Sequence, residues 1–284
     1  ILDGVGTAMR LGFITDSHID ADGAPIWEGV DSYQNLLQTI EYLNKQELDA
    51  VVFGGDLAYA AERYDDARAD AMYQAAKPAL DQIKAPLFAI LGNHDRHNMF
   101  AEYLGAYRQG DPGPDLTYIA EVDGWRLIML DTVEPGLTEG MISDFSAEWV
   151  GEKIAENPDQ PTLVFAHQPP FSCNADPAHD MEFHNSELLA EALIPCTGLK
   201  GIFSGHYHRV INWEWRGVPY HVGPSTAAQF PTPGSGFDKH QPEFVIPGLQ
   251  IITANDTALS VETIWLGDDP FALAAKKRAA QSVV

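Results

Sequence analysis

The sequence LFAILGNHD, residues 87–95, joins a short apolar run directly to four residues of a different chemical character. A run of five apolar residues bounded by glycine is typical of a buried β-strand. The glycine permits a turn and a close backbone approach, whereas Asn93, His94 and Asp95 carry oxygen and nitrogen atoms that bind metal ions. The composition of the chain predicts a chance match to these four residues in about one chain in five hundred. The stretch therefore predicts a strand whose carboxyl end carries metal ligands.

The same pattern of an apolar strand followed by metal-binding side chains occurs at four other places. In open α/β sheets, ligands bind outside the carboxyl ends of the strands. We therefore expect all five strand ends to converge on one site, although they are spread over nearly two hundred residues. The other four strands and their ligands are Leu11–Thr15 before Asp16 and His18, Ala50–Phe53 before Asp56, Thr162–Ala166 before His167, and Gly201–Ser204 before His206 and His208.

The side chains at these ends are imidazoles, carboxylates and one amide, without a thiolate. This set favours manganese, iron, zinc or cobalt over copper–thiolate or iron–sulfur sites. Seven ligands are too many for one ion and suit two ions about 3.5–4 Å apart that share a carboxylate. Two such ions lower the pKa of bound water from about 15.7 toward about 7, so a metal-bound hydroxide is available at neutral pH. The pattern thus predicts hydrolysis without a protein nucleophile.

The rest of the chain alternates apolar runs with helical periodicity, which predicts a layered α/β protein. Its length of 284 residues with 45% hydrophobic residues supports one domain. We assign that domain to residues 9–284 and interpret residues 1–8 as an N-terminal extension or a cloning remnant. Several later strands suggest antiparallel pairing, and therefore two sheets. The expected helices are 33–43, 64–83, 187–193 and a terminal one, the later strands are 125–130, 210–215, 218–222, 249–253 and one after Ala258, and Pro231–Pro242 is an expected loop.

The charge of the chain argues against nucleic acid as a partner. Asp and Glu number 41 against 17 Lys and Arg, a net charge of −24, and no Lys/Arg run is present that could track a phosphate backbone. Cys173 and Cys196 are the only cysteines, and we interpret both as inert. The first ten residues lack a secretion signal, and no apolar run approaches the ~20 residues that span a bilayer. We expect a cytoplasmic protein without a membrane anchor.

The five motifs, in the order D-x-H, G-D, G-N-H-D, H and G-H-x-H, resemble those of the calcineurin-like metallophosphoesterases. The resemblance spans Asp16 to His208, about two-thirds of the chain, with every motif position filled. Softer motifs resemble the class III cyclic-nucleotide phosphodiesterases and bacterial glycerophosphodiesterases: His167-Gln168-Pro169-Pro170, a helix at Asn185, and Gly223–Ala227 before Gln229. The likeness implies a four-layer αββα sandwich of two mixed sheets flanked by helices. It also implies a homodimer or higher homo-oligomer.

The resemblance assigns roles to individual residues. Asp16, His18 and His208 would hold one metal, and Asn93, His167 and His206 the other, with Asp56 bridging both. His94 would contact the phosphate and assist the leaving group, either by donating a proton or by stabilising charge on the phosphoryl oxygens. Asp95 would orient a neighbouring ligand as a hydrogen-bond acceptor.

Some positions depart from the family's sequence pattern, and the roles of some others are not decided by the sequence. Tyr59, in Gly55-Asp56-Leu57-Ala58-Tyr59, resembles the iron-binding tyrosine of purple acid phosphatases, but because His18 is present we interpret Tyr59 as a packing or rim residue. Met181-Glu182 stands where the relatives tend to carry Met-Asp, so details of the substrate pocket stay open. Further candidates for substrate contact are Asn93, Arg96, Arg209, His97, His184, Trp27, Phe171 and Phe183. A surface role explains the two arginines equally well and apolar packing the three aromatic rings, whereas a surface or core role is favoured for the two histidines.

The function favoured by the sequence is hydrolysis of a small phosphodiester, such as a cyclic nucleotide or a glycerophosphodiester. A phosphomonoesterase is the nearest alternative because it uses the same metal site. A non-catalytic protein-binding scaffold is a second alternative, which the complete ligand set disfavours. A DNA repair nuclease of the same fold is disfavoured by the charge of −24.

Overall fold

The computed structural model describes residues 8–27, 29–171, 183–231, 241–255 and 257–268. Strands and helices alternate along most of this length, as the sequence predicts. The strands are β1 (Met9–Ile14), β2 (Ala50–Phe53), β3 (Leu87–Ala89), β4 (Asp111–Pro112), β5 (Tyr118–Val122), β6 (Trp125–Met129), β7 (Thr162–Phe165), β8 (Leu199–Ser204), β9 (Ile211–Trp215), β10 (Val218–Val222), β11 (Gly248–Ala254) and β12 (Leu259–Trp265). The α-helices are α1 (Ser32–Leu43), α2 (Asp66–Leu80), α3 (His97–Leu104), α4 (Asp144–Glu156) and α5 (Ser186–Leu193), and the short 3₁₀ helices are η1 (Ala21–Gly23), η2 (Ala61–Arg63) and η3 (Gly105–Tyr107).

These strands form two mixed sheets. The first has the order β12-β11-β1-β2-β3 and the second β4-β5-β6-β7-β8-β10-β9. In the first sheet β1, β2 and β3 are parallel, and in the second β6, β7, β8 and β10 are parallel. The remaining pairs are antiparallel. The ligand-bearing ends therefore belong to three parallel strands of one sheet and two of the other.

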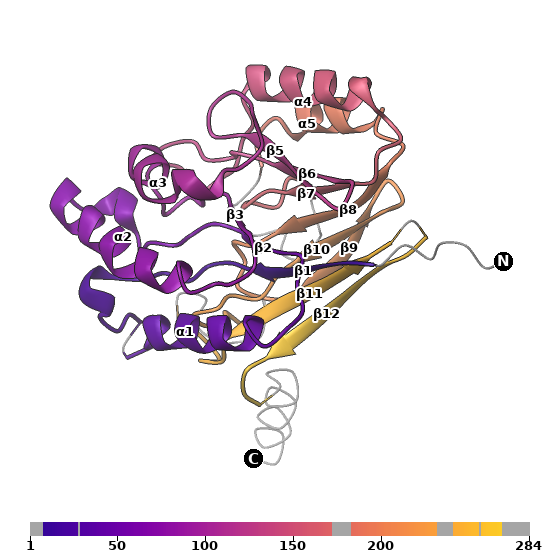
Figure 1. Cartoon of the computed structure of the whole chain (residues 1–284). Coiled ribbons are helices and arrows are strands. Elements are labelled where there is room, and N and C mark those ends of the chain that lie inside the picture. The colour runs from indigo at the N-terminus through magenta and orange to yellow at the C-terminus, as the bar shows by residue number, and fades with distance from the viewer. Residues whose placement is uncertain (1–7, 28, 172–182, 232–240, 256, 269–284) are drawn as a thin grey trace, which may run out of the picture.

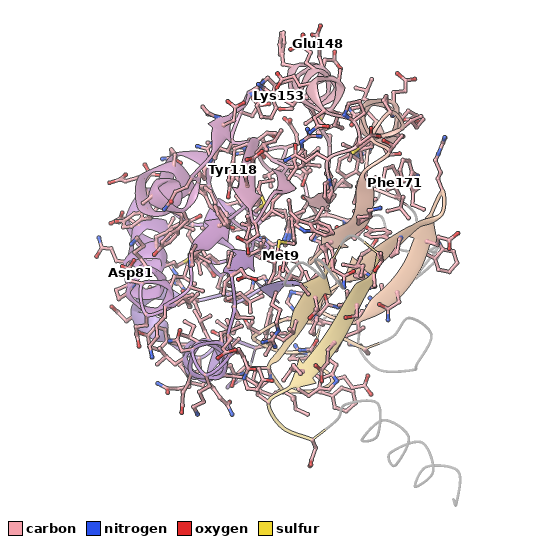
Figure 2. The ribbon with its side chains drawn as sticks, turned by 45° about the vertical axis from the view of Figure 1, so that its right-hand side comes forward. Met9, Asp81, Tyr118, Glu148, Lys153 and Phe171 are labelled. Carbon is pink, nitrogen blue, oxygen red and sulfur yellow. The ribbon has the colours of Figure 1, made fainter. Side chains whose placement is uncertain are left out.

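The two sheets lie face to face between two layers of helices (Figure 1). Helices α1, α2 and α3 cover the outer face of the first sheet, and α4 and α5 cover the second. Between the sheets, Phe13 packs against Phe165 with ring centroids 5.7 Å apart, and Phe165 stacks on Phe203 at 5.2 Å. Met9 and Tyr118 belong to this inner core, whereas Glu148 and Lys153 lie on the outer helix α4 (Figure 2). The four-layer αββα sandwich is thus confirmed.

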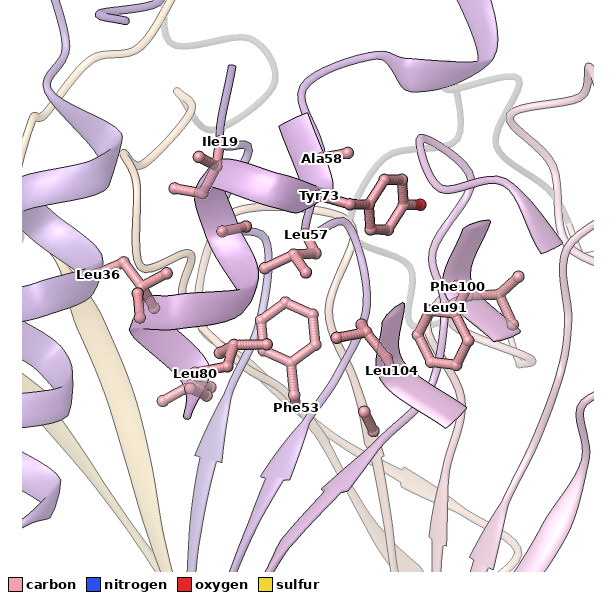
Figure 3. Close-up of a cluster of buried hydrophobic side chains, with 14 of the residues drawn as sticks. Ile19, Leu36, Phe53, Leu57, Ala58, Tyr73, Leu80, Leu91, Phe100 and Leu104 are labelled. Atoms are coloured by element: carbon pink, nitrogen blue, oxygen red, sulfur yellow. The ribbon is translucent and has the colours of Figure 1, made fainter. Parts of the chain in front are cut away.

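Strand β2 illustrates why the parallel strands are apolar throughout. Because successive side chains point to opposite faces, Val51 and Phe53 pack under the helices while Ala50 and Val52 face the second sheet. In the outer core Phe53 lies among side chains of α2 and α3 (Figure 3). Each large side chain that is fully buried here contributes about 1.5–3 kcal/mol to folding. This core contains none of the polar strand-end ligands, and the strands that it holds fix their positions.

Helices α3 and α4 were not predicted from the sequence. Helix α4 begins after Ser143, whose hydroxyl accepts a hydrogen bond from the Ser146 N–H at 3.0 Å. Its buried residues Ala147, Val150 and Ile154 recur at helical spacing, so the periodicity was present in the sequence. Helix α2 starts two residues later than expected because Asp65 caps it, accepting from the Arg68 N–H at 2.9 Å.

Several expectations concern residues outside the described part of the chain. These are the terminal helix, most of the loop Pro231–Pro242, nearly all of the extension 1–8, Cys173 and Met181-Glu182. Cys196 is buried and makes no disulfide. Among the helices that the structure describes, none combines the length and apolar character needed to cross a membrane.

Candidate metal centre and active site

The five ligand-bearing strand ends converge at one edge of the sandwich. The seven side chains named from the sequence come from both sheets, and their residues are between 0% and 9% exposed. Burying so many polar groups together is costly unless each finds a partner. Their mutual distances show what kind of ligand such a group could bind.

One half of the cluster consists of Asp16, His18 and His208. The His208 Nε2 atom lies 3.3 Å from Asp16 Oδ1 and 2.9 Å from His18 Nε2. Two nitrogen ligands at right angles, each about 2.0–2.1 Å from a metal ion, are about 2.9 Å apart. These three side chains are therefore spaced as ligands of one ion.

The other half contains Asp56, Asn93, His167 and His206. The His167 Nε2 atom lies 3.3 Å from Asp56 Oδ2 and 3.2 Å from Asn93 Oδ1. Ligand atoms of Asp56, His167 and His206 all fall within 4.8 Å of one another. Asp56 Oδ2 is also 3.7 Å from His18 Nε2 in the first half. The Asp56 carboxylate thus stands between the two groups, where a bridging ligand would lie.

Hydrogen bonds behind the histidines fix the direction of their free nitrogen atoms. His167 Nδ1 donates to the Gly54 carbonyl at 2.8 Å, and His208 Nδ1 to the Ala228 carbonyl at 3.1 Å. A proton held on Nδ1 leaves the Nε2 lone pair facing the centre of the cluster. Asp16 accepts from the Thr15 hydroxyl at 2.7 Å, which orients its carboxylate.

The chemistry of the cluster fits metal ions. Burial lowers the pKa of His18 well below its usual value and that of His206 to about 3, so both rings are neutral. Burial alone would raise the pKa of Asp16, but His208 and His167 lower it to about 2, so the carboxylate stays ionised. His206 Nε2 is buried and has no hydrogen-bond partner. Burial opposes protonation of His167, but Asp56 and Asp16 outweigh it and raise its pKa to about 9, so metal binding would displace a proton there. Neutral imidazoles, ionised carboxylates and an unpaired nitrogen are what transition-metal ions bind. When bound, two such ions would neutralise phosphoryl oxygens and acidify a water molecule.

Most of these ligands are held in a strained backbone conformation. A left-handed φ costs a non-glycine residue about 1–2 kcal/mol and is retained only where the surroundings enforce it. Strain of this kind clusters at functional sites. Five of the seven residues have a left-handed φ angle: Asp16 (φ 56°), His18 (47°), Asp56 (55°), His206 (72°) and His208 (49°).

Two glycines give the ligands the room that they occupy. A Cβ atom on Gly92 would lie 2.2 Å from Asp56 Oδ1, and one on Gly205 would lie 2.1 Å from Thr15 Oγ1 and 2.5 Å from Asp16 Oδ2. Both contacts are far shorter than van der Waals separation. These glycines therefore serve close approach rather than turn formation alone.

His94 stands beside the metal ligands, held at two points. Its backbone N–H donates to Asp56 Oδ1 at 2.8 Å, and its ring Nδ1 lies 2.8 Å from Glu62 Oε1. Burial opposes protonation of the ring, but Asp56 and Glu62 outweigh it and raise the pKa of His94. Glu62 was not predicted as a site residue, because it lies in the short helix η2 outside every motif.

Asp95 holds the backbone after Asp56 instead of a ligand side chain. Its carboxylate accepts from the backbone N–H of Gly92 at 2.9 Å, from that of Ala58 at 3.2 Å and from the Tyr73 hydroxyl at 2.9 Å. Burial and the nearby Asp56 charge raise the pKa of Asp95 to about 6. Asp95 thereby ties two ligand-bearing loops together.

A pocket of about 410 Å³ opens above the cluster. His18, Asp56, Asn93, His206 and His208 form its floor. One side is aromatic, with Trp27, Tyr59 and Phe230, and the remaining wall includes His94, Thr138, Tyr207, Ala60 and two arginines, Arg63 and Arg209.

Other candidates from the sequence do not line this pocket. Arg96 Nε donates to the Ala61 carbonyl at 2.9 Å, and its other nitrogens contact Asp66 and the Tyr64 carbonyl. His97 Nε2 pairs with Asp131 at 3.0 Å in a separate pocket. His184 is exposed on the segment beside Gly140.

The two phenylalanines suggested as pocket residues take packing positions. Phe171 stacks on Trp215 with centroids 4.1 Å apart, in the core beneath the second helical layer, and Figure 2 shows it well away from Met9 of the inner core. Phe183 packs against the same core. Of the three aromatic candidates, only Trp27 reaches the pocket.

Comparison with known proteins agrees with this geometry. The family model described as calcineurin-like phosphoesterase matches residues 9–210, which include all seven clustered side chains. The chain belongs to the calcineurin-like phosphoesterase family. Membership confirms both the predicted resemblance and the predicted enzyme class, a phosphoric ester hydrolase.

Individual members of the calcineurin-like phosphoesterase family are similar to the chain over most of its length. The 3',5'-cyclic adenosine monophosphate phosphodiesterase CpdA of Escherichia coli is 28% identical over 93% of this chain and 92% of its own. The glycerophosphodiester phosphodiesterase GpdQ of Enterobacter lignolyticus is 26% identical over 78% of this chain and 79% of its own. A dimetal phosphatase from Danio rerio shares the fold, with a TM-score of 0.70 at 14% identity, over 93% of this chain and all of that one.

Proposed function

We propose that this phosphoesterase hydrolyses a small phosphodiester with the help of two metal ions. The observation that carries the proposal is the position of Asp56, whose carboxylate lies within 3.7 Å of a histidine nitrogen in each half of the cluster. A pair of cations that share such a carboxylate can act on both the attacking and the leaving oxygen of an in-line displacement.

The roles of the ligands follow from their grouping. Asp16, His18 and His208 would hold the first cation, and Asn93, His167 and His206 would hold the second, with Asp56 as the ligand common to both. Manganese, iron, zinc and cobalt all suit this mixture of imidazole, carboxylate and amide.

His94 serves the leaving group. Glu62 holds its Nδ1 atom, which leaves Nε2 for an oxygen of the substrate. In hydrolysis the bond from phosphorus to the departing oxygen breaks while a water oxygen adds to phosphorus. A proton donated from His94 Nε2 would convert the departing oxygen to an alcohol.

The preference for a diester is supported by the relatives whose names specify diester substrates. Both the cyclic-nucleotide and the glycerophosphodiester relatives cover more than three quarters of this chain. The pocket of about 410 Å³ also has room for a group beyond the phosphate itself.

The test is a substrate panel with defined metals. The protein is stripped with a chelator and reloaded separately with Mn²⁺, Zn²⁺, Co²⁺ or Fe²⁺, and turnover of bis-p-nitrophenyl and mono-p-nitrophenyl phosphate is compared. We expect the stripped protein to be inactive and the reloaded protein to prefer the diester. A clear preference for the monoester would replace the diesterase by a phosphomonoesterase. Neither metal uptake nor turnover would identify a scaffold.

A further inference from the structure

Aromatic rings gather on one side of the pocket, and none of them is among the seven clustered side chains named as metal ligands. Trp27 meets Tyr59 edge to face, with centroids 5.7 Å apart and planes at 90°, and meets Phe230 at 5.2 Å and 86°. The three rings come from three connecting segments far apart in the sequence. All three line the pocket and are only partly buried, so each keeps surface toward the substrate space.

The backbone holds Trp27 in this place at an energetic cost. Its φ of 40° lies in the left-handed region, which is unusual for a bulky side chain. The turn is closed by Ile26 and Val30, which exchange backbone hydrogen bonds of 2.9 Å and 2.7 Å, and both side chains pack against Ala228. Strain that the surroundings enforce beside an active site indicates a functional position.

The neighbouring rings are fixed by the ligand loops. The Tyr59 N–H donates to the Ile19 carbonyl at 3.0 Å, and the Phe230 N–H donates to the His208 carbonyl at 3.1 Å. Trp27 itself lies 5.2 Å from the His18 ring and 5.7 Å from the His208 ring. The aromatic wall is therefore rigidly placed next to the first metal-binding group.

The charges around the pocket indicate what kind of chemical group would pack against these three aromatic rings. Aromatic cages also bind quaternary ammonium groups. Here the same pocket is lined by Arg63 and Arg209, which would repel a cation. Glu62, the acidic neighbour of Arg63, is engaged by His94 and by Arg63 itself. A neutral planar ring attached to an anionic phosphate fits this combination better.

We propose that Trp27 is a specificity-determining residue whose indole stacks on a planar aromatic group, a nucleobase or aryl ring, attached to the substrate phosphate. This inference rests on the proposed function, because it names the class of diester that the same pocket prefers. Stacking of a base on an aromatic side chain changes binding by a factor of about 5 to 150.

The experiment compares Trp27→Ala and Trp27→Phe on metal-loaded protein with three diesters: 3',5'-cyclic AMP, glycerophosphoglycerol and glycerophosphocholine. Metal content is measured for every variant. We expect Trp27→Ala to lower kcat/KM at least about tenfold for cyclic AMP, mainly through KM, and less than about threefold for the two diesters without a ring. Trp27→Phe should recover most of the loss. Trp213→Ala, on the exposed edge strand β9, is the matched control.

Each other outcome overturns the inference. Equal losses on all three diesters, together with lost metal, would show that Trp27 only packs the histidines. A selective loss on glycerophosphocholine would identify a cation cage. If the wild-type protein hydrolyses none of the diesters, the proposed function fails, but the stacking can still be tested. Calorimetry then measures how well adenosine monophosphate competes with inorganic phosphate for binding to the wild-type protein and to Trp27→Ala. Equal affinity of the two proteins for adenosine monophosphate would then refute it.

Discussion

The pocket has two parts that are built in different ways: the seven clustered side chains that could hold metal ions, which we call the cage, and the rim around them. The cage residues follow buried strands, and a continuous apolar core fixes their positions. The rim residues Trp27, Tyr59, Glu62 and Phe230 lie on connecting segments and are placed by contacts with one another and with the cage. The clustered side chains are thus anchored in the fold, whereas the rim is carried by loops that can change without disturbing the sheets.

This comparison predicts the largest effect for the ligand shared by both halves of the cage. Asp56→Ala should lower kcat/KM by at least about 10³-fold, because metal ions supply several kcal/mol of transition-state stabilisation. The protein should stay folded, since the apolar core does not depend on this carboxylate. Activity, metal content and thermal unfolding monitored by circular dichroism check both statements.

The matched control for this change is Glu148→Ala, which removes an exposed acid on α4. It should leave activity and metal content unchanged. If Asp56→Ala unfolds and Glu148→Ala does not, the cage is chiefly structural. The apolar core would then depend on the metal-ligand residues and could not be treated as independent of them.

A smaller but still large effect is expected for Gly92→Ala. The added Cβ would fall 2.2 Å from Asp56 Oδ1 and 2.4 Å from the Asp56 backbone nitrogen, so a ligand loop must move. Overpacking of this kind costs about 1–3 kcal/mol of stability, and a displacement of about 1 Å at a reacting centre can cost about a hundredfold in rate. Urea unfolding and steady-state kinetics measure the two effects.

Gly105→Ala is the control for this substitution, because a Cβ there meets nothing within 4 Å. It should be neutral or slightly stabilising. Equal behaviour of the two variants would mean that the strand ends tolerate movement and that the fold does not hold the metal ligands rigidly.

The rim is tested first at Glu62. Because its carboxylate holds His94 Nδ1 at 2.8 Å, Glu62→Ala should lower turnover about 10- to 100-fold without changing metal content. The loss should grow as the leaving alcohol becomes more basic if His94 donates a proton, and should be uniform if His94 only stabilises charge. Glu62→Gln, which keeps an oxygen acceptor, should retain more activity. An unchanged rate in Glu62→Ala would show that the cage orients His94 unaided.

The same difference between cage and rim explains which site residues could be predicted from the sequence. The strand ends were predictable because apolar runs and ligand residues are adjacent in the chain, as in Phe53-Gly54-Gly55-Asp56. Glu62 and Phe230 were missed because nothing in their local sequence indicates that they face the site. Arg96 and His97 were considered for the opposite reason: they follow the Gly92–Asp95 motif directly, but the chain turns into α3 and directs their side chains to other partners. Roles that depend on tertiary contacts leave no local pattern.

The smallest effect is expected for the Tyr59 hydroxyl. The Tyr59 ring meets Trp27 edge to face, and its centroid lies 6.4 Å from that of His18. Tyr59→Phe keeps the ring against Trp27, so metal content should not change and kcat/KM should fall less than about threefold. The iron-loaded wild-type protein should lack the visible tyrosinate charge-transfer band. If the iron-loaded wild-type protein is coloured, and Tyr59→Phe lacks both the visible band and one metal ion, then Tyr59 is a metal ligand. It would then belong to the cage and not to the rim.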